Sequence, residues 1–314
     1  MSRVVVTGGA GFVGSHLCEA LLARGDEVVC IDNLSTSDGS NLASLDLLPG
    51  FTFIPADVTE GFNVEGRVDV VAHLASPASP PEYMRLALET LAVGSRGTEA
   101  CLKLAGQNDA RFLFASTSEI YGDPLVHPQP ETYWGNVSSI GPRSVYDEAK
   151  RFGEALAMAY TRYKSVDVGI VRIFNTYGPR LRRGDGRVVS NFIFQALSGQ
   201  PLTIYGDGLQ TRSFCYVDDL VAGLIALIDR HGFVGPVNLG NPQEITVAEL
   251  AQRVLDLTGS ASEVAYLPAA EQDPARRQPD IKIAQTMLEW SPKISLEDGL
   301  ERTVNWFREK IDQP

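Results

Sequence analysis

The feature that most constrains this chain is a glycine-rich turn near its start, in the stretch "RVVVTGGAGFVGSH". Gly8, Gly11 and Gly14 lie between a β-branched run and a helical pattern. Glycines at these positions let the backbone turn tightly and approach a pyrophosphate, which the N-terminus of the following helix holds. The spacing alone is a weak signal, so a tight strand-to-helix connection without a ligand remains the alternative.

An acidic residue at the end of the next β-branched run favours the ligand-binding interpretation. Asp32 stands where a carboxylate accepts hydrogen bonds from the ribose hydroxyls of an adenosine. A carboxylate there disfavours a 2′-phosphate, and no arginine lies beside it, so the sequence favours NAD over NADP. Asp57 and Val58 follow the third predicted strand and suit the adenine edge.

Strand and helix patterns alternate through the first half of the chain. Such alternation predicts an α/β fold with a Rossmann-type, doubly wound parallel sheet. The predicted strands are Arg3–Thr7, Glu27–Ile31, Phe51–Ile54, Asp69–His73, Arg111–Ala115 and Val166–Arg172. The predicted helices are Gly11–Arg24, Pro81–Ala105 and Val145–Tyr163.

The pattern changes near Gly178 to longer loops rich in glycine, proline and arginine. We therefore expect two domains, 1–177 and 178–314, the second smaller and closing over the carboxyl edge of the sheet. Its predicted helices are Val217–Asp229, Val247–Leu257 and Leu296–Lys310. The run "PVNLGN", Pro236–Asn241, is expected to return one strand to the main sheet.

Composition narrows the class of partner. The net charge of −12 and the pI near 4.8 argue against a surface for nucleic acid or for an anionic membrane. The four cysteines and four histidines show no metal-ligand spacing, so no metal is expected. No apolar run is long enough to span a bilayer and no signal peptide is evident, which predicts a cytoplasmic protein with reduced thiols.

A tyrosine and a lysine are the first catalytic candidates. In "YDEAK", Tyr146 and Lys150 are four residues apart and share one face of a helix. The ammonium is expected to stabilise the phenolate and to lower the tyrosine pKa from about 10 toward neutrality. A surface tyrosine beside a solvated lysine is the alternative. Thr117, Ser118 and Glu119 follow a predicted buried strand, and ligands bind at such strand ends in parallel sheets.

Longer stretches of the sequence carry a resemblance to a known family. They are "VTGGAGFVGSH", "HLASPASPPEYM", "ASTSEIYGDPLVHPQPETYWGNV", "IGPRSVYDEAKR", "RIFNTYGPR" and "GDGLQTRSFCYVDDL". With these stretches in order, the chain resembles the extended short-chain dehydrogenase/reductase family, and within it the UDP-glucuronate decarboxylases. The resemblance covers nearly the whole chain and implies an enzyme with tightly bound NAD.

The resemblance implies a lyase that converts UDP-glucuronate to UDP-xylose without net redox change. Tyr146 would take the 4-hydroxyl proton as C4 is oxidised, and Lys150 would hold the nicotinamide ribose. Loss of carbon dioxide leaves an enolate that Thr117 and protonated Tyr146 would stabilise. Ser118 stands where related 4,6-dehydratases carry an aspartic acid, which favours decarboxylation over loss of water. Glu119 would position the sugar and a water near C5, either protonated or hydrogen-bonded to a ring hydroxyl.

The same resemblance assigns the remaining binding residues. For NAD they are Gly8, Gly11, Phe12, Val13, Gly14, Asp32, Asn33, Thr36, Asp57, Val58, Leu74, Ala75, Ser76, Ala115, Tyr146, Lys150 and Thr176. For the UDP-sugar they are Pro77, Tyr83, Glu119, Asn175, Arg187, Val189, Tyr205, Arg212 and Arg277. Arg212 and Arg277 are expected on the diphosphate. A homodimer is implied, through Pro81–Ala105 and Val145–Tyr163.

Two stretches depart from the family pattern. Gly94, in "TLAVGSRGT", stands where an asparagine is usual, and Leu34–Asn41 lacks the usual basic residues. Both changes are expected to loosen contacts to NAD or the sugar, which predicts partial release of UDP-4-keto-pentose. The alternatives are an enzyme that releases mainly this ketone, a nucleotide-sugar 4-epimerase or 4,6-dehydratase, and a dinucleotide-sensing regulatory protein without catalysis.

Overall fold

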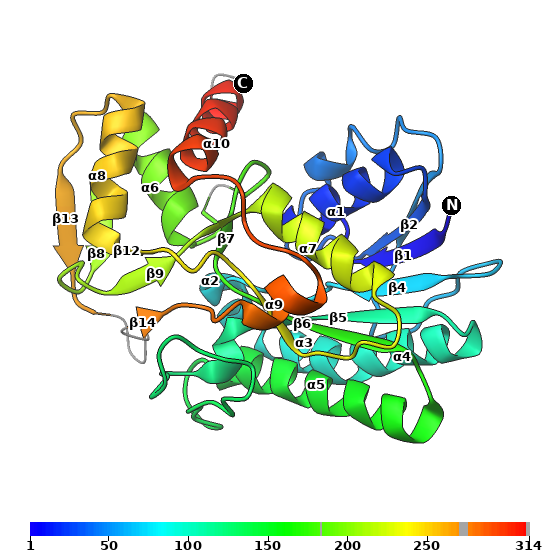
Figure 1. The fold of residues 1–314 in the computed structure, drawn as a ribbon. Coiled ribbons are helices and arrows are strands. Elements are labelled where there is room, and N and C mark those ends of the chain that lie inside the picture. Colours follow the sequence, from blue (N-terminus) through cyan, green and yellow to red (C-terminus); the bar gives the residue numbers. More distant parts are fainter. Residues whose placement is uncertain (183, 270–275, 312–314) are drawn as a thin grey trace.

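The centre of the molecule is a parallel sheet of seven strands. The computed structural model describes residues 1–182, 184–269 and 276–311. Its main sheet has the order β11-β6-β5-β4-β1-β2-β3 (Figure 1). The strands are β1 (Arg3–Thr7), β2 (Glu27–Asp32), β3 (Phe51–Pro55), β4 (Val70–His73), β5 (Arg111–Thr117), β6 (Val168–Ile173) and β11 (Val237–Leu239). Because the chain leaves β3 and returns beside β1 as β4, the strand order reverses between β1 and β4, where such sheets bind ligands.

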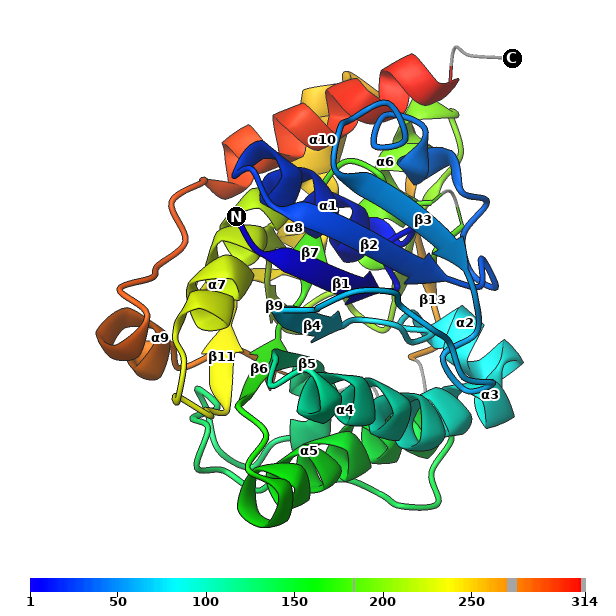
Figure 2. The same cartoon turned by 90° about the vertical axis from the view of Figure 1, so that its right-hand side faces the viewer.

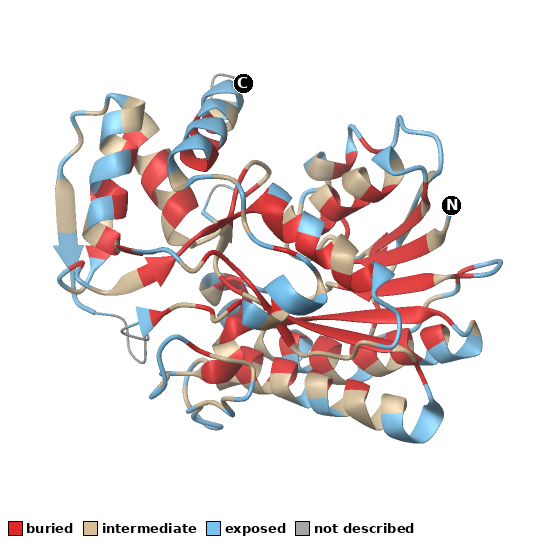
Figure 3. Cartoon of the chain, viewed as in Figure 1, coloured by how far each residue is buried: buried red, intermediate tan, exposed pale blue. Residues whose placement is uncertain are grey.

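Helices cover both faces of the sheet (Figure 2). One face carries α1 (Phe12–Ala23) and α7 (Val217–Asp229), and the other carries α4 (Thr98–Gln107) and α5 (Ser144–Lys164). Side chains of a strand alternate between faces, so Val4 and Val6 pack into one core and Val5 into the other. Both faces of the sheet are therefore buried, and most of its strands are coloured as buried in Figure 3. The doubly wound α/β fold is confirmed.

The second half of the chain forms a smaller group of helices and short strands. Its helices are α6 (Val188–Leu197), α8 (Val247–Thr258), α9 (Lys282–Met287) and α10 (Leu296–Ile311). Its strands are β7 (Thr176–Tyr177), β8 (Leu202–Tyr205), β9 (Thr211–Ser213), β10 (Cys215–Tyr216), β12 (Glu244–Thr246), β13 (Val264–Leu267) and β14 (Arg276–Arg277). Strand β11 pairs in parallel with β6, so the predicted return of a strand from this half is confirmed.

The predicted helix Pro81–Ala105 is wrong as a single element. The chain instead forms α2 (Pro80–Arg85), α3 (Ala87–Ala92), a π-helical turn η2 (Val93–Gly97) and then α4. The first break lies at Leu86, whose φ of −112° and ψ of 47° are not helical. In the π turn, a side chain at Gly94 would place its Cβ 2.6 Å from the Cβ of Ala149 on α5. Glycine at this position therefore lets η2 lie directly against α5.

The other differences are small. Strand β5 continues to Thr117 instead of ending at Ala115, so the hydroxyl side chain of Thr117 belongs to a fixed strand. The next residues form a short 3₁₀ turn, η3 (Ser118–Tyr121), and the Thr117 hydroxyl accepts a hydrogen bond from the amide of Glu119. Within the described ranges, no helix is long and apolar enough to cross a membrane.

A buried polar network fixes α5 to the sheet. The guanidinium of Arg172 on β6 donates to both carboxylate oxygens of Glu154 on α5, at 2.9 and 2.8 Å. The hydroxyl of Ser116 on β5 donates to the same carboxylate at 2.6 Å. Arg172 also donates to the hydroxyl of Tyr121, which in turn donates to Asn238 on β11. One carboxylate thus joins α5 to two adjacent strands.

We predict that Glu154→Ala lowers the free energy of unfolding by about 3 kcal/mol, because it leaves the buried Arg172 guanidinium without its counter-ion. Glu148→Ala is the matched control, since Glu148 lies on the same helix in a half-exposed pair with Arg151 at 3.5 Å. The control should change the free energy of unfolding by less than about 1 kcal/mol. Urea unfolding measures both, and equal losses would contradict the role given to Glu154.

Candidate active site

A large cavity lies at the carboxyl ends of the sheet strands, between the two halves of the chain. Its volume is about 1860 Å³. Each residue assigned above to NAD, to the sugar or to catalysis lines this cavity, from Gly8 on the first turn to Arg277 on β14. The structure thus brings together residues from both ends of the sequence, while their individual roles stay predictions.

The glycine turn after β1 forms the floor of the dinucleotide end. Gly8 has a φ of +74°, and a Cβ there would lie 2.7 Å from the backbone nitrogen of Ala75. Asp32 accepts from the amides of Ala10 at 3.0 Å and Leu34 at 2.9 Å, and burial raises its carboxyl pKa. A glycine turn without side chains, a helix N-terminus behind it and a carboxylate at the end of a strand fit a dinucleotide. The carboxylate suits an adenosine ribose that carries no 2′-phosphate.

Tyr146 and Lys150 lie on the first turns of α5, as predicted, but their electrostatics differ from the prediction. The Nζ of Lys150 donates to the carbonyl of Ala115 at 2.9 Å and lies 5.8 Å from the centre of the Tyr146 ring. Burial lowers the pKa of Lys150 to about 8. The pKa of Tyr146 is raised to about 12, mainly by burial, with the Thr117 hydrogen bond opposing and the charge of Glu119 adding to the rise.

The expectation that Lys150 alone brings the Tyr146 pKa toward neutrality is therefore wrong for this structure. The phenol is almost fully buried, and a phenolate there would lie near the carboxylate of Glu119. Both effects favour the protonated form more than a distant ammonium disfavours it. The protonated phenol is therefore the favoured form of Tyr146.

Glu119 is an ionised, paired carboxylate. The Nη1 of Arg277 donates to its Oε1, and the Nη2 of Arg143 donates to its Oε2 at 2.7 Å. Burial alone would raise its pKa, but the charges and hydrogen bonds of the two arginines lower it to about 2. The expectation of a protonated Glu119 is wrong, because two guanidinium groups hold its charge. Arg277, expected on the diphosphate, contacts Glu119 here.

Tyr83 covers one face of Tyr146, the predicted catalytic tyrosine. Its ring stacks on that of Tyr146 with centroids 5.1 Å apart and an interplanar angle of 5°. Within the described residues its buried hydroxyl has no hydrogen-bond partner, and burial raises its pKa well above the ordinary value. The prediction that Tyr83 approaches the sugar fits a hydroxyl at the cavity wall.

The opposite wall carries the predicted nucleotide-binding cations. Arg212 on β9 and Arg277 on β14 lie directly opposite each other on adjacent parallel strands. Their side chains therefore project from neighbouring backbone positions, and both line the cavity. Arg187 is paired with Asp185 at 3.0 Å. Tyr205, at the end of β8, is 52% exposed at the rim, where it is accessible to a flat ring.

Sequence reasoning missed several charged residues of this cavity, among them Arg143, Glu82 and Arg182. Arg143 lies three positions before Tyr146, and helical spacing points such a residue to the same side as the tyrosine. Glu82 and Arg182 contact each other across 100 residues of sequence. Nothing in the local pattern indicates such a pair.

Comparison with known proteins agrees with this geometry. The sequence model of the NAD dependent epimerase/dehydratase family matches residues 4–240. The chain belongs to this family. UDP-glucuronic acid decarboxylase 1 from Arabidopsis thaliana is 53% identical over 309 residues, covering 98% of this chain and 70% of that protein. The protein of the same name from Xenopus tropicalis is 50% identical over 310 residues, covering 99% and 73%. The resemblance drawn from the sequence is confirmed, and the family's cofactor is NAD.

Solved structures of the family have the same architecture. UDP-glucose 4-epimerase from Thermotoga maritima, solved with UDP-glucose, is 30% identical with a TM-score of 0.89, covering 99% of this chain and 100% of that chain. UDP-glucuronic acid 4-epimerase from Bacillus cereus, solved with UDP-glucuronic acid and NAD, is 31% identical with a TM-score of 0.86, covering 98% and 99%. Both likenesses extend over the second half of the chain as well as the sheet.

We predict a specific acid dependence for Glu119. Its folded pKa of about 2 lies below the ordinary 4.5, so its stabilising contribution is complete above pH 4.5 and is lost as pH falls toward 2. The loss corresponds to about 3 kcal/mol between pH 5 and 2. Urea unfolding across this range should therefore be less pH-dependent in Glu119→Gln than in the wild type. Glu99→Gln, which changes a surface carboxylate outside the cavity, is the control and should keep the wild-type profile.

Proposed function

We propose that this protein decarboxylates UDP-glucuronate to UDP-xylose by oxidation, loss of carbon dioxide and re-reduction at C4. The observation that carries the proposal is the charge arrangement beside Tyr146. One carboxylate, Glu119, is matched there by two guanidinium groups, those of Arg143 and Arg277. Guanidinium groups beside Tyr146 suit a sugar that carries a carboxylate of its own. The relatives named UDP-glucuronic acid decarboxylases support the same substrate.

The chain's residues suggest how the first step is catalysed. NAD, when bound, accepts the C4 hydride and later returns it. Tyr146 takes the proton of the 4-hydroxyl, and the Thr117 hydroxyl stabilises the phenolate by a hydrogen bond. Lys150, fixed by the carbonyl of Ala115, points its ammonium toward the same end of the cavity. These groups sit on β5 and α5, which the Glu154 network holds together.

Decarboxylation needs less from the protein than oxidation does. Once C4 is a ketone, the C6 carboxylate leaves as carbon dioxide and the electron pair moves onto O4 as an enolate. Protonated Tyr146 and the Thr117 hydroxyl stabilise that oxygen. Ser118 supplies no acid for elimination of water, and ionised Glu119 orients a water that reprotonates C5. The arginines that hold Glu119 also offset its repulsion of the substrate carboxylate.

The product decides between this function and its alternatives. The similarity to UDP-glucuronic acid 4-epimerase from Bacillus cereus favours a 4-epimerase as the second candidate. Incubation with UDP-glucuronate, followed by proton nuclear magnetic resonance, should give mainly UDP-xylose without stoichiometric added NAD⁺. A smaller UDP-4-keto-pentose fraction is expected from the departures at Gly94 and Leu34–Asn41. UDP-galacturonate with its carboxylate intact would overturn the proposal in favour of epimerisation.

We predict that Tyr146→Phe lowers kcat for decarboxylation by about 10²-fold or more, the usual contribution of a general base. Tyr163→Phe is the matched control, because Tyr163 lies on the same helix and is 81% exposed. The control should keep wild-type turnover. A Tyr146→Phe protein that binds substrate and retains most of its kcat would show that another group takes the proton.

The protein is further proposed to act as a homodimer in the cytoplasm, with a cofactor half at 1–177 and a nucleotide-sugar half at 178–314. Exposed apolar side chains support the dimer: Met84 on α2, Leu88 and Leu91 on α3, and Phe152 on α5. These helices pack beside one another, so the side chains share one side of the molecule.

For the dimer, sedimentation equilibrium at micromolar concentration should give twice the chain mass. Leu88→Arg should shift the protein toward monomer, because Leu88 is 78% exposed on the proposed contact face and an arginine there would have to be desolvated. Leu209→Arg changes an exposed leucine of the second half and is the control. A wild-type monomer would reject the dimer.

A further inference from the structure

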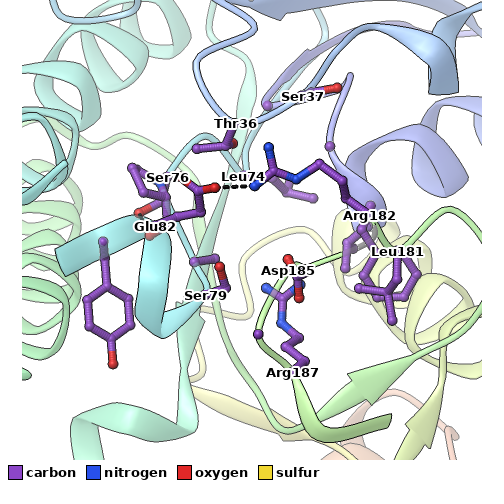
Figure 4. A pocket seen from close by; sticks show the side chains of 18 of the residues that line it. Thr36, Ser37, Leu74, Ser76, Ser79, Glu82, Leu181, Arg182, Asp185 and Arg187 are labelled. Carbon is purple, nitrogen blue, oxygen red and sulfur yellow. Dashed lines mark hydrogen bonds and ion pairs between the residues drawn. The ribbon is translucent and has the colours of Figure 1, made fainter. Parts of the chain in front are cut away.

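Glu82 lies at the centre of a set of contacts that crosses the mouth of the cavity. It belongs to α2, and its carboxylate accepts hydrogen bonds from two arginines on opposite sides. Arg85, one turn further along α2, donates through Nε to Oε2 at 2.9 Å. Arg182, from the loop after β7, donates to Oε1. Figure 4 shows Glu82 and Arg182 reaching toward each other across the pocket, with Thr36 and Ser37 on one side of the pair and Asp185 and Arg187 on the other.

The contacts of Glu82 extend, through Arg85, to the loop that follows Asp32, the predicted ribose-binding residue. The guanidinium of Arg85 also donates to the carbonyl of Ser35 at 3.3 Å. On the other side of the cavity, the side-chain amide of Asn41 donates to the carbonyl of Arg180 at 3.4 Å. The loop beyond Asp32, helix α2 and the loop beyond β7 are thus joined to one another in a ring.

A direct backbone contact accompanies the ion pairs. Gly186 has a φ of +90°, and a Cβ there would lie 2.5 Å from the Cγ of Pro81 at the start of α2. The loop after β7 therefore touches α2 independently of Arg182. Glu82 is largely buried within this contact, and its pKa is lowered because hydrogen bonds and charges of Arg85 and Arg182 outweigh the effect of burial. The carboxylate stays ionised at physiological pH, so the pair remains attractive.

The ring encloses the path between the two ends of the dinucleotide. Asp32 and the glycine turn lie at one end, Tyr146 and Lys150 lie at the other, and the bridge residues line the same cavity between them. Glu82 and Arg182 are thus placed to hinder the exit of a long ligand that spans these ends. Asp185 and Arg187 lie on the side of the pair away from Thr36 and Ser37 and line the same cavity.

We propose that Glu82 and Arg182 form a bridge that retains the dinucleotide during turnover, so that Glu82 is a positioning residue for cofactor retention. The inference rests on the proposed function in one respect, because that reaction returns the hydride to the carbon it came from. Reduced dinucleotide that escapes between oxidation and re-reduction leaves a ketone product and a protein unable to finish the cycle. A bridge that slows escape of the dinucleotide therefore favours completion of the cycle.

The experiment measures release of NADH from the intact protein. Protein loaded with NADH is mixed with excess NAD⁺, and the loss of bound NADH fluorescence gives the dissociation rate. Arg182→Gln should raise this rate by about two- to fivefold, as expected for loss of one partly exposed ion pair. Arg182→Lys keeps the charge and should lie between Arg182→Gln and the wild type. Raising the salt concentration should accelerate release from the wild type and have little effect on Arg182→Gln.

Further variants distinguish the specific effect of the Glu82–Arg182 contact on NADH release from a general destabilisation of the protein. Glu82→Gln should release NADH at least as fast as Arg182→Gln, because it also weakens the contact with Arg85, and the double variant should be no faster than Glu82→Gln. Glu99→Gln, which breaks the surface pair with Lys103 outside the cavity, is the control and should match the wild type. If Glu82→Gln folds poorly by circular dichroism, Arg182→Gln carries the test, since its side chain is 43% exposed.

An unchanged dissociation rate in Arg182→Gln, or additive effects in the double variant, would overturn the bridge. The outcome is distinct from that of the proposed function, because the release assay contains no nucleotide sugar. A protein that decarboxylates UDP-glucuronate but shows no bridge effect refutes only this inference. A protein that shows the bridge effect but leaves UDP-glucuronate intact refutes only the proposed function.

Discussion

The pairing of Arg172 with Glu154 is the interaction on which the active site most depends. Tyr146 and Lys150 lie on α5, whereas Thr117 ends β5 and Glu119 lies in η3. The proposed reaction requires all four at fixed separations. Apolar packing between a helix and a sheet allows small sliding motions, but a bidentate guanidinium–carboxylate contact has a set direction. The hydrogen bond from Ser116 brings β5 into the same contact. The network therefore fixes the helix to the strand at the distance that the catalytic groups need.

Charge in the cavity is arranged in pairs with a small excess of positive groups. Glu119 lies between Arg143 and Arg277, and Glu82 lies between Arg85 and Arg182. In each case one carboxylate contacts two guanidinium groups, within a chain that is acidic as a whole, with a net charge of −12. An acidic surface with positive clusters inside one cavity directs an anionic ligand to that cavity and away from the rest of the molecule.

Local patterns predicted much of the fold and the site. The β-branched runs, the glycine turn and Asp32 predicted the sheet and its dinucleotide end, because strand periodicity and positive φ depend on residues close in sequence. The four-residue spacing predicted that Tyr146 and Lys150 lie together. The same reasoning missed the state of Glu119, whose partner Arg277 is 158 residues away, and therefore also the effect of that charge on the Tyr146 pKa. It also missed the π turn, which follows from a contact with α5 and not from local propensity.

The contact between Gly94 and Ala149 limits which amino-acid substitutions these two positions can accept during evolution. A Cβ at position 94 would lie 2.6 Å from the Cβ of Ala149, and 2.9 Å from its carbonyl oxygen, so the two positions share space for a single methyl group. A side chain can be gained at position 94 only if position 149 gives one up or the backbones separate. Ala149 precedes Lys150, so separating the backbones would displace a residue of the proposed active site. The residues at the two positions should therefore covary among related proteins. Proteins with a larger residue at one position should have glycine at the other.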